Sequence, residues 1–352
     1  MTKVRYKSMS EQFDISVVIS TYNRCDMLPA AMESVLAQDA NGISYEVVIV
    51  DNNSTDRTRA AVEAFIARGH ANVRYVFEAQ QGLSHARNAG ISAARAPIVA
   101  FTDDDVRAAP DWIVSIKRAF DEHPEVDFVG GKVLPQWLAT PPAWLTKKHW
   151  SPLAILDYGD EQFYVDTEKQ LCLVGANLSF RRAVFEQTGL FKPDLQRVKD
   201  GVGSMEDHEF LLRVWATGRR GLYVPGIVMS AEVQEERMTK QYHRRWHTGH
   251  GHFYALMRAE EMEQSDARLF DVPAHLYRNV LQSAIGWLAQ SLRAHEELTF
   301  KHETELRFFR GFFRQRRKEF NATKPRSTPR EVALFVQSLV AAKLHRKVKR
   351  ES

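Results

Sequence analysis

Three consecutive aspartates, Asp103 to Asp105, are the residues of this chain whose type and spacing most directly suggest chemistry. Adjacent carboxylates repel one another, so their clustering is explained if a divalent cation neutralises them. Mg²⁺ and Mn²⁺ prefer oxygen ligands and bind one or two carboxylates together with diphosphate oxygens. Because side chains alternate in an extended segment, we assign Asp105 to the metal and Asp103 to a ribose or to the metal's outer shell. A solvated acidic turn is the alternative.

Polar side chains also follow two apolar runs at residues 15–20 and 45–50, which have the β-branched composition of strands buried on both faces. Ligands of open parallel sheets bind beyond the carboxyl ends of the strands. Asp51 is therefore positioned to accept a hydrogen bond from a base N–H or a ribose hydroxyl. Helix capping is the alternative reading of residues such as Ser54. The nucleotide-binding candidates at the three strand ends are Thr21, Tyr22, Asn23, Arg24, Asp51, Asn53, Ser54, Asp103 and Asp104.

The phosphate charge needs a partner, because the chain has neither a GxxxxGK[ST] loop nor a GxGxxG turn after its first strand. Arg87 is the candidate, since an arginine fork matches phosphate oxygens. The alternative is a solvated cation on a helix face.

A second acidic cluster, Glu206-Asp207-His208-Glu209, precedes a helical pattern. A carboxylate there could act as general base toward an acceptor hydroxyl. Acidic residues at a helix N-terminus also gain about 0.3 to 1 kcal/mol from the helix dipole, which is the structural alternative.

The elements that must position these residues alternate along the first hundred residues. Apolar strand patterns at 15–20, 45–50, 73–77 and 98–102 are separated by helical patterns at 27–38, 55–68 and 83–94. This order predicts an α/β fold with a mostly parallel central sheet. Residues 136–160 are rich in Trp and Pro and predict a long irregular segment that packs against the protein or an apolar acceptor.

Together, these motifs resemble those of the family 2 glycosyltransferases with the A-type fold, over roughly residues 14–250. The joint pattern is far more specific than any single motif. The resemblance rests on Thr21-Tyr22-Asn23-Arg24, Asp51-Asn-x-Ser-x-Asp56, Gly82-Leu-x-x-Ala-Arg87-Asn88-x-Gly90, Asp103-Asp-Asp105 and Glu206-Asp207. It implies a Rossmann-like nucleotide-diphospho-sugar transferase fold, in which the nucleotide-binding candidates hold a sugar donor.

The resemblance also implies a hexosyltransferase-type enzyme that inverts the anomeric centre, with the acceptor hydroxyl attacking in line with the departing nucleoside diphosphate. By that likeness Asp51 meets the base, Asp103 the ribose and Asp105 the Mn²⁺ or Mg²⁺ ion. Asp207, beside Glu206, becomes the general base. A UDP-sugar is the favoured donor, with GDP- and TDP-sugars as alternatives, and a glycan, a lipid-linked saccharide or a small molecule is the acceptor.

Further positions follow from the same likeness. Gly175 and Asn177 resemble the segment that lines the donor sugar. Members of the family often carry a histidine metal ligand after a Pro-Gly turn, but Pro225-Gly226 is followed by none here, and Glu232 is the nearest substitute. The histidines at 243–252 are the other candidates. The segment 241–246 is similar to the acceptor motif of processive synthases with one extra residue, and without membrane spans we expect a non-processive enzyme.

Composition sets the wider expectations. Two cysteines, Cys25 and Cys172, cannot form a disulfide framework, and neither a signal peptide nor a run of 18 apolar residues occurs, so we expect a cytoplasmic protein. We predict an N-terminal arm at 1–13, a catalytic domain at 14–235 and a helical, basic region at 236–352. A sugar nucleotidyltransferase or a non-catalytic module that binds membrane or nucleic acid are the competing functions.

The net positive charge of the chain comes from its C-terminal tail. Residues 301–352 hold 15 Lys and Arg against 5 Asp and Glu, whereas residues 1–300 carry a net charge of −6. Such a segment suits an anionic membrane surface or nucleic acid, and a solvated helical face is the alternative. We expect peripheral attachment to the inner face of a membrane and no nucleic acid partner. The phenylalanines at 308, 309, 312 and 313 would enter the bilayer, or equally pack in a core.

Overall fold

The computed structural model describes residues 13–195, 205–323, 332–333 and 335–337 of this 352-residue chain. They form two compact units. The first takes in residues up to 138, 153–195 and 206–233, and the second takes in 139–152, Met205 and the described residues from 234 onward. Nearly all of the expected N-terminal arm and most of the tail beyond 323 lie outside the described residues. No described helix is long and apolar enough to cross a membrane.

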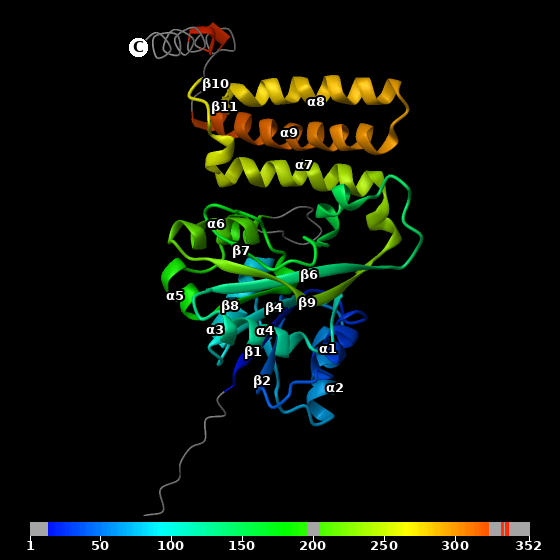
Figure 1. The fold of residues 1–352 in the computed structure, drawn as a ribbon, viewed down its shortest axis with the longest axis vertical. Coiled ribbons are helices and arrows are strands. Elements are labelled where there is room, and N and C mark those ends of the chain that lie inside the picture. Colours follow the sequence, from blue (N-terminus) through cyan, green and yellow to red (C-terminus); the bar gives the residue numbers. More distant parts are fainter. Residues whose placement is uncertain (1–12, 196–204, 324–331, 334, 338–352) are drawn as a thin grey trace, which may run out of the picture. The chain divides into compact units, whose positions relative to one another are not determined.

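The first unit is built on a sheet whose four N-terminal strands are all parallel (Figure 1). β1 pairs with β2 on one side and with β4 on the other, and β2 pairs with β3. These strands are β1 (Ile15–Thr21), β2 (Tyr45–Asp51), β3 (Val73–Phe77) and β4 (Ile98–Asp103). The register sets Thr21 beside Asp51 and Ser20 beside Asp103, so the polar residues after the strands emerge at one edge. The predicted α/β fold with a parallel centre is confirmed.

Antiparallel pairings extend this sheet beyond β4, in the order β3-β2-β1-β4-β8-β6-β9-β5. β8 is antiparallel to both β4 and β6, whereas β6 and β9 run parallel. β5 and β7 each pair with β9 in antiparallel fashion. The bounds are β5 (Val106–Ala108), β6 (Phe128–Trp137), β7 (Phe163–Val165), β8 (Leu178–Arg181) and β9 (Gly221–Val233).

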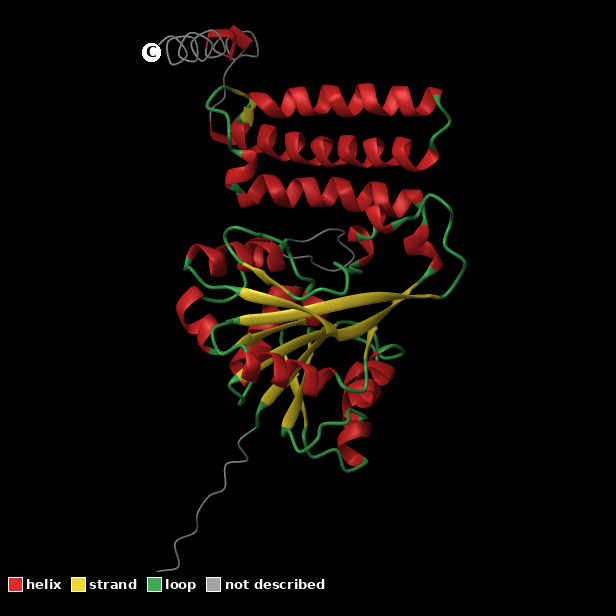
Figure 2. Cartoon of the chain, in the orientation of Figure 1, coloured by secondary structure: helices red, strands yellow, loops and turns green. Residues whose placement is uncertain are grey.

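Helices cover both faces of the sheet, because the central strands are apolar on both sides (Figure 2). On one face α3, α5 and α6 pack against β1, β2 and β4, with Phe101, Phe185 and Phe210 in one apolar cluster. α4 packs against β6 and β9, and α1 against β5. The helices of this unit are α1 (Leu28–Leu36), α2 (Thr58–Ala67), α3 (Leu83–Ala93), α4 (Trp112–Glu122), α5 (Ala183–Thr188) and α6 (Glu206–Ala216). Short 3₁₀ turns complete the chain: η1 (Lys147–His149), η2 (Ser151–Leu153), η3 (Gly175–Asn177), η4 (Pro193–Leu195), η5 (Glu235–Met238) and η6 (Glu260–Met262).

The second unit, called the helical unit below, is built from α7 (Lys240–Met257), α8 (Ala274–Leu292) and α9 (Glu296–Thr323), with a small hairpin of β10 (Arg268–Leu269) and β11 (Val272–Pro273). α9 packs against α7 and also against α8 (Figure 1). Glycines allow α7 and α9 to approach closely. A Cβ atom at Gly311 would overlap the carbonyl oxygen of Thr248, and one at Gly251 would overlap that of Phe308.

The phenylalanines of α9 belong to the core of the helical unit. Phe312 is fully buried in a cluster with Ala255, and Phe308, Phe309 and Phe313 are partly buried against it. Of the two alternatives for these rings, the structure shows core packing and not insertion into a bilayer. The reason is that their positions on α9 face α7 and α8.

The Trp-rich segment divides between the two units. Residues 139–152 belong to the helical unit, where the Trp144 ring lies 5.1 Å from the His243 ring and 4.6 Å from the Phe300 ring. These 14 residues were expected within the catalytic domain. Their apolar rings pack with α7 and α9, which the strand and helix periodicity of the sequence does not reveal.

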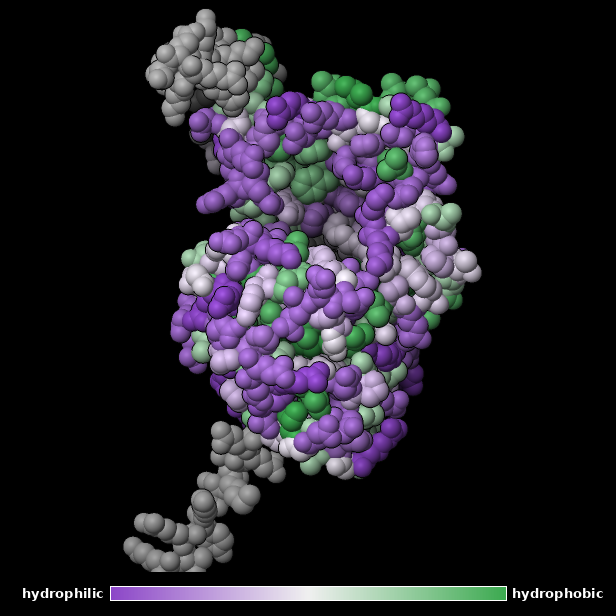
Figure 3. All heavy atoms as spheres, in the orientation of Figure 1, coloured by the Kyte–Doolittle hydropathy of each residue, from purple (hydrophilic) through white to green (hydrophobic). Residues whose placement is uncertain are grey.

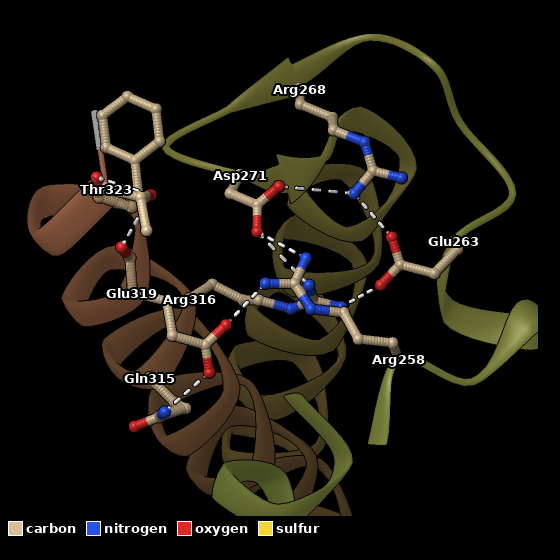
Figure 4. Close-up of polar contacts among 9 residues, drawn as sticks. Arg258, Glu263, Arg268, Asp271, Gln315, Arg316, Glu319 and Thr323 are labelled. Atoms are coloured by element: carbon tan, nitrogen blue, oxygen red, sulfur yellow. Dashed lines mark hydrogen bonds and ion pairs between the residues drawn. The ribbon is translucent and has the colours of Figure 1, made fainter. Parts of the chain in front are cut away.

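A network of arginines and carboxylates joins α7, α9 and the hairpin at one end of the helical unit (Figure 4). Arg316 of α9 is fully buried and pairs with Glu263 and Asp271. Arg258, just after α7, pairs with Asp271 and with Glu319. Arg316 was counted among the basic residues that suit an anionic surface, but its charge is satisfied inside the protein.

Candidate functional site

Strand β4 ends at Asp103, and Asp104 and Asp105 form the turn that leads into β5, so the triplet is not extended throughout as expected. Asp104 is buried, and its carboxylate accepts a hydrogen bond of 2.7 Å from the Thr21 hydroxyl. Burial, followed by repulsion from Asp105, raises the pKa of Asp104 to about 7. Asp104 and Thr21 therefore support the strand ends from inside the fold, although both were predicted to touch the nucleotide.

The other two aspartates of this segment remain accessible. The side chain of Asp103 is 31% exposed and that of Asp105 is 19% exposed. A guanidinium nitrogen of Arg24 lies 3.8 Å from the Asp105 carboxylate, at the end of β1. These are the carboxylates that can reach a ligand at this edge of the sheet.

Asp51 lies at the end of β2 and is only 2% exposed. One of its oxygens accepts from the Tyr75 hydroxyl at 2.7 Å, and the other accepts from the backbone N–H of Ser54 at 2.9 Å. Burial and the bond to Asp51 raise the pKa of Tyr75. Sequence reasoning missed Tyr75. Its signal was a hydroxyl-bearing aromatic on β3, the strand that pairs with β2.

The two loops after β1 and β2 hold each other in place. The Asn23 side chain accepts from the backbone N–H of Thr55 at 2.7 Å, and the Asn23 backbone N–H donates to the Ser54 hydroxyl at 2.9 Å. Asn23 and Asn53 adopt left-handed backbone conformations, with φ of 50° and 65°. Tyr22 lies half-buried in the same turn. The structure thus brings these predicted residues together and assigns Asn23 and Ser54 to loop positioning.

Arg87 joins the acidic segment to the second acidic cluster. It is buried on α3, and one guanidinium nitrogen pairs with Asp207 and lies 3.2 Å from a Glu206 oxygen. Another nitrogen of the same group lies 3.9 Å from Asp103. Three carboxylates therefore surround the Arg87 guanidinium, and charged side chains are rarely buried unless they are paired. The predicted contact of Arg87 with phosphate stays a prediction.

Asp207 lies in the first turn of α6 and keeps 22% of its side chain exposed. Its second oxygen accepts from the backbone N–H of Gly175 at 3.1 Å. Burial raises the pKa of Asp207 to about 6, against the lowering effect of Arg87. Glu206 is buried, and one of its oxygens has no hydrogen-bond partner among the described residues. The side chain that can meet an acceptor is therefore Asp207.

Gly175 and Asn177, both predicted to line the donor sugar, differ in what they contact. A Cβ at Gly175 would overlap Asp207 and Arg87, so only glycine allows this approach to the carboxylate. Asn177 is buried, and its side chain accepts from the Trp112 indole and donates to the carbonyls of residues 132 and 227. All of its polar atoms are used within the protein, so Asn177 holds the sheet together.

Asp103 and Asp105 are partly exposed, and their carboxylate oxygens are the type of ligand that Mg²⁺ and Mn²⁺ prefer. Among the described residues no group of three or more His, Cys, Asp or Glu could hold a metal by itself. Mg²⁺ and Mn²⁺ do not require one, since they commonly use one or two carboxylates with phosphate oxygens. The Glu232 backbone N–H donates to the Asp105 carbonyl at 3.2 Å, but its carboxylate is paired with Arg107 at 2.6 Å.

The histidine alternative is not supported at position 243. His243 is fully buried in the helical unit, and burial lowers its pKa to about 3. Its ring packs edge-on against Trp144.

The parallel strand edge, its accessible aspartates and the arginine-linked acidic cluster are features that the resemblance to the A-type glycosyltransferases predicts. The chain carries a region that matches the family described as "Glycosyl transferase family 2", at residues 16–189. The predicted resemblance to this family and the predicted fold are confirmed.

Named relatives agree with this class. A glucosyl-dolichyl phosphate glucuronosyltransferase of Haloferax volcanii is 28% identical over 213 residues, which cover 59% of this chain and 66% of the relative. A validoxylamine A glucosyltransferase of Streptomyces hygroscopicus is 37% identical over 107 residues, or 30% of this chain and 25% of the relative. The matched stretches thus span less than two thirds of either relative's own length.

Solved structures share the fold at low sequence identity. Residues 1–349 of S. aureus TarS, solved with UDP-GlcNAc, give a TM-score of 0.51 with 18% identity, covering 85% of this chain and 92% of that fragment. A mannosyltransferase of Pyrobaculum calidifontis, solved with GDP-Man and Mn²⁺, gives a TM-score of 0.50 with 20% identity, covering 95% of this chain and 81% of that protein.

Proposed function

We propose that this enzyme transfers a sugar, with inversion, from a nucleoside-diphosphate donor to an acceptor hydroxyl. The observation that carries the proposal is the position of Arg87, which pairs with Asp207 and lies 3.9 Å from Asp103. One buried side chain thereby links the expected donor edge to the expected base. A UDP-sugar is the favoured donor, and transfer is non-processive.

Asp207 is the general base of the proposed reaction. The Asp207 carboxylate takes the proton of the acceptor hydroxyl as the acceptor oxygen attacks the anomeric carbon. The bond between that carbon and the diphosphate oxygen breaks on the opposite face, which inverts the centre. The Gly175 N–H and Arg87 hold the carboxylate in one orientation.

On the donor side, Asp51 is proposed to meet the base, Asp103 the ribose and Asp105 a divalent metal ion. Such an ion, when bound, neutralises the charge that develops on the departing diphosphate. Arg24, 3.8 Å from Asp105, adds a fixed positive charge at the same strand end. The P. calidifontis mannosyltransferase, whose structure contains GDP-Man and Mn²⁺, supports the proposal of a metal-assisted donor site.

The acceptor is proposed to be a lipid-linked saccharide, a glycan or a small molecule. The similarity to a glucosyl-dolichyl phosphate glucuronosyltransferase supports the first, and that to a validoxylamine A glucosyltransferase supports the last. A lipid-linked acceptor requires the enzyme to work at a membrane, so we also propose peripheral attachment to an anionic bilayer.

Nucleoside diphosphate release from a panel of UDP-, GDP- and TDP-sugars with Mn²⁺ tests this proposal. The Asp207→Asn variant keeps the shape of the side chain but cannot accept the proton, so its rate should fall roughly 10² to 10⁴-fold. Asp121→Asn, at an exposed carboxylate on α4, is the matched control and should retain full activity. In the wild type, kcat/KM should rise as pH increases through about 6, where Asp207 loses its proton. An Asp207→Asn variant as active as the control would refute the assignment.

A further inference from the structure

Helix α8 presents a continuous apolar stripe to its surroundings. Leu281 is 60% exposed, Ile285 60%, Leu288 55% and Leu292 81%, and these four residues are called the α8 stripe. Their spacing of four, three and four residues places them on one face of the helix. Trp287, at 41% exposure, lies next to them in sequence. Figure 3 shows hydrophobic atoms gathered along this helix.

The opposite face of α8 is the one that packs. Leu276 and Ser283 are buried, and the Ser283 hydroxyl donates to Glu305 of α9 at 2.8 Å. A Cβ at Gly286 would meet the His302 ring of α9, which shows how closely the two helices approach there. Helix α9 contacts both α7 and α8, so α8 lies at the edge of the three helices and has one face that does not pack against α9. Within the described chain, the α8 stripe therefore has no helix packed over it.

The charges around the stripe indicate an anionic partner. Helix α8 contains no Asp or Glu, and its charged side chain is the exposed Arg278. Arg293, immediately after the helix, is also exposed. Two cations thus stand at the two ends of an uncharged apolar face. Helices that lie in a bilayer interface have this pattern, because their apolar side chains enter the acyl boundary while arginines extend to the lipid phosphates.

A second copy of the chain fits the same face less well. Stable interfaces use about 20 to 30 residues from each partner, bury about 800 Å² on each side, and are not built from one stripe of four side chains. Another α8 would also offer no carboxylate to Arg278 or Arg293. The size and the charge of the face both favour lipid.

We propose that the α8 stripe is the surface through which this enzyme docks on an anionic lipid bilayer. The proposal rests on the peripheral attachment proposed above and gives it a location. The α8 stripe takes the membrane-inserting role that was expected of the α9 phenylalanines, which are packed inside the helical unit. The arginines draw the helix to the lipid surface, and the stripe then enters the interface.

Flotation of the full-length chain with phosphatidylcholine vesicles, with and without phosphatidylglycerol, tests the location. The wild type should float with the anionic vesicles, and Ile285→Gln/Leu288→Gln should reduce the bound fraction at least about tenfold, because two large apolar side chains no longer enter the interface. The matched control is Ile66→Gln/Leu190→Gln, which removes two apolar side chains of 40% and 43% exposure from the first unit. It should float like the wild type. Arg278→Gln/Arg293→Gln should bind less and lose most of its sensitivity to salt.

Two results would overturn the proposal. One is equal flotation of the Ile285→Gln/Leu288→Gln variant and the wild type. The other is an absence of vesicle binding together with a dimer, seen by sedimentation, that the same double substitution converts to monomer. Nucleotide-induced thermal stabilisation of the same proteins separates this test from the proposed transfer reaction. The α8 stripe variants should retain that stabilisation. If nucleotide does not stabilise the wild type, the result argues against the enzymatic proposal and leaves the docking proposal standing.

Discussion

At the scale of single residues, Arg87 is the side chain on which the site geometry depends most. It is buried and has three carboxylates around it, with Asp207 and Glu206 on one nitrogen. Removing one partner of a buried ion pair leaves the other charge uncompensated. The same pairing fixes the direction of the Asp207 oxygen that would accept the proton.

Arg87→Gln should therefore lower the free energy of unfolding by roughly 3 to 5 kcal/mol. Arg87→Lys keeps the positive charge but loses the forked guanidinium, so its free energy of unfolding should lie between those of Arg87→Gln and the wild type. Urea denaturation followed by circular dichroism measures the difference. An unfolding midpoint that stays at the wild-type value in Arg87→Gln would mean that the acidic cluster does not need this cation.

Asp104 makes a second prediction, on pH. Its carboxyl titrates near 3.8 in a model peptide and at about 7 in the fold. Between these values the folded state holds a proton that the unfolded state has lost, so this group makes the protein less stable as pH rises from about 4 to about 7. Asp104→Asn keeps an acceptor for the Thr21 hydroxyl and cannot ionise. The variant should thus gain stability over the wild type across this range, at roughly 1.4 kcal/mol per unit of pKa shift.

Urea unfolding of both proteins at pH 4.5 and pH 8, with EDTA present, measures this gain. Asp207 titrates in the same direction in both proteins, so only the difference between them reports on Asp104. If the two proteins differ in free energy of unfolding by the same amount at both pH values, Asp104 does not hold a proton in the folded state as described.

At the scale of elements, the first four strands and the edge where their polar residues emerge could be predicted from sequence. Apolar, β-branched runs such as Ile15–Thr21 leave little choice of conformation. The contacts that the side chains make were harder to predict from the sequence. Arg87 and Asn177 carry ordinary ligand-binding groups, but whether they meet a ligand or the protein depends on α6 and on β6 and β9, which are distant in sequence.

Pairings over long sequence distances limited the prediction in two other places. The Tyr75 hydroxyl bonds to Asp51 because β3 lies beside β2, and the residue type alone does not reveal this. Trp144 packs in the helical unit, although it lies between two strands of the first unit in the chain. Local patterns predict elements, whereas these contacts depend on tertiary packing.

The close crossing of α7 and α9 gives a prediction at this scale. Gly311→Ala gains up to about 1 kcal/mol of helix propensity, but the added Cβ overlaps the Thr248 carbonyl. Overpacking costs roughly 1 to 3 kcal/mol, so the variant should be less stable despite its better helix former. Gly226→Ala is the control, since no heavy atom lies within 4 Å of its added Cβ. Thermal unfolding compares them, and a raised melting temperature for Gly311→Ala would contradict the packing described.

At the scale of the whole molecule, the two compact units differ in what they offer. The first unit supplies the side chains assigned to donor and acceptor chemistry, from Asp51 to Asp207. The helical unit supplies the basic charge and the α8 stripe. A sugar nucleotidyltransferase or a simple binding module would not need the base and the donor edge to share one arginine.

The claim on which the enzyme proposal depends is that Asp103 and Asp105 serve a nucleoside diphosphate together with a cation. Calorimetric titration of UDP and GDP into the protein, with Mn²⁺ and with EDTA, measures it directly. We predict that Mn²⁺ strengthens nucleotide binding at least about tenfold, or 1.4 kcal/mol, in the wild type and in the Asp121→Asn control, and that Asp105→Asn abolishes this gain. Nucleotide affinity that is the same with Mn²⁺ and with EDTA, or a gain that survives in Asp105→Asn, would contradict the account.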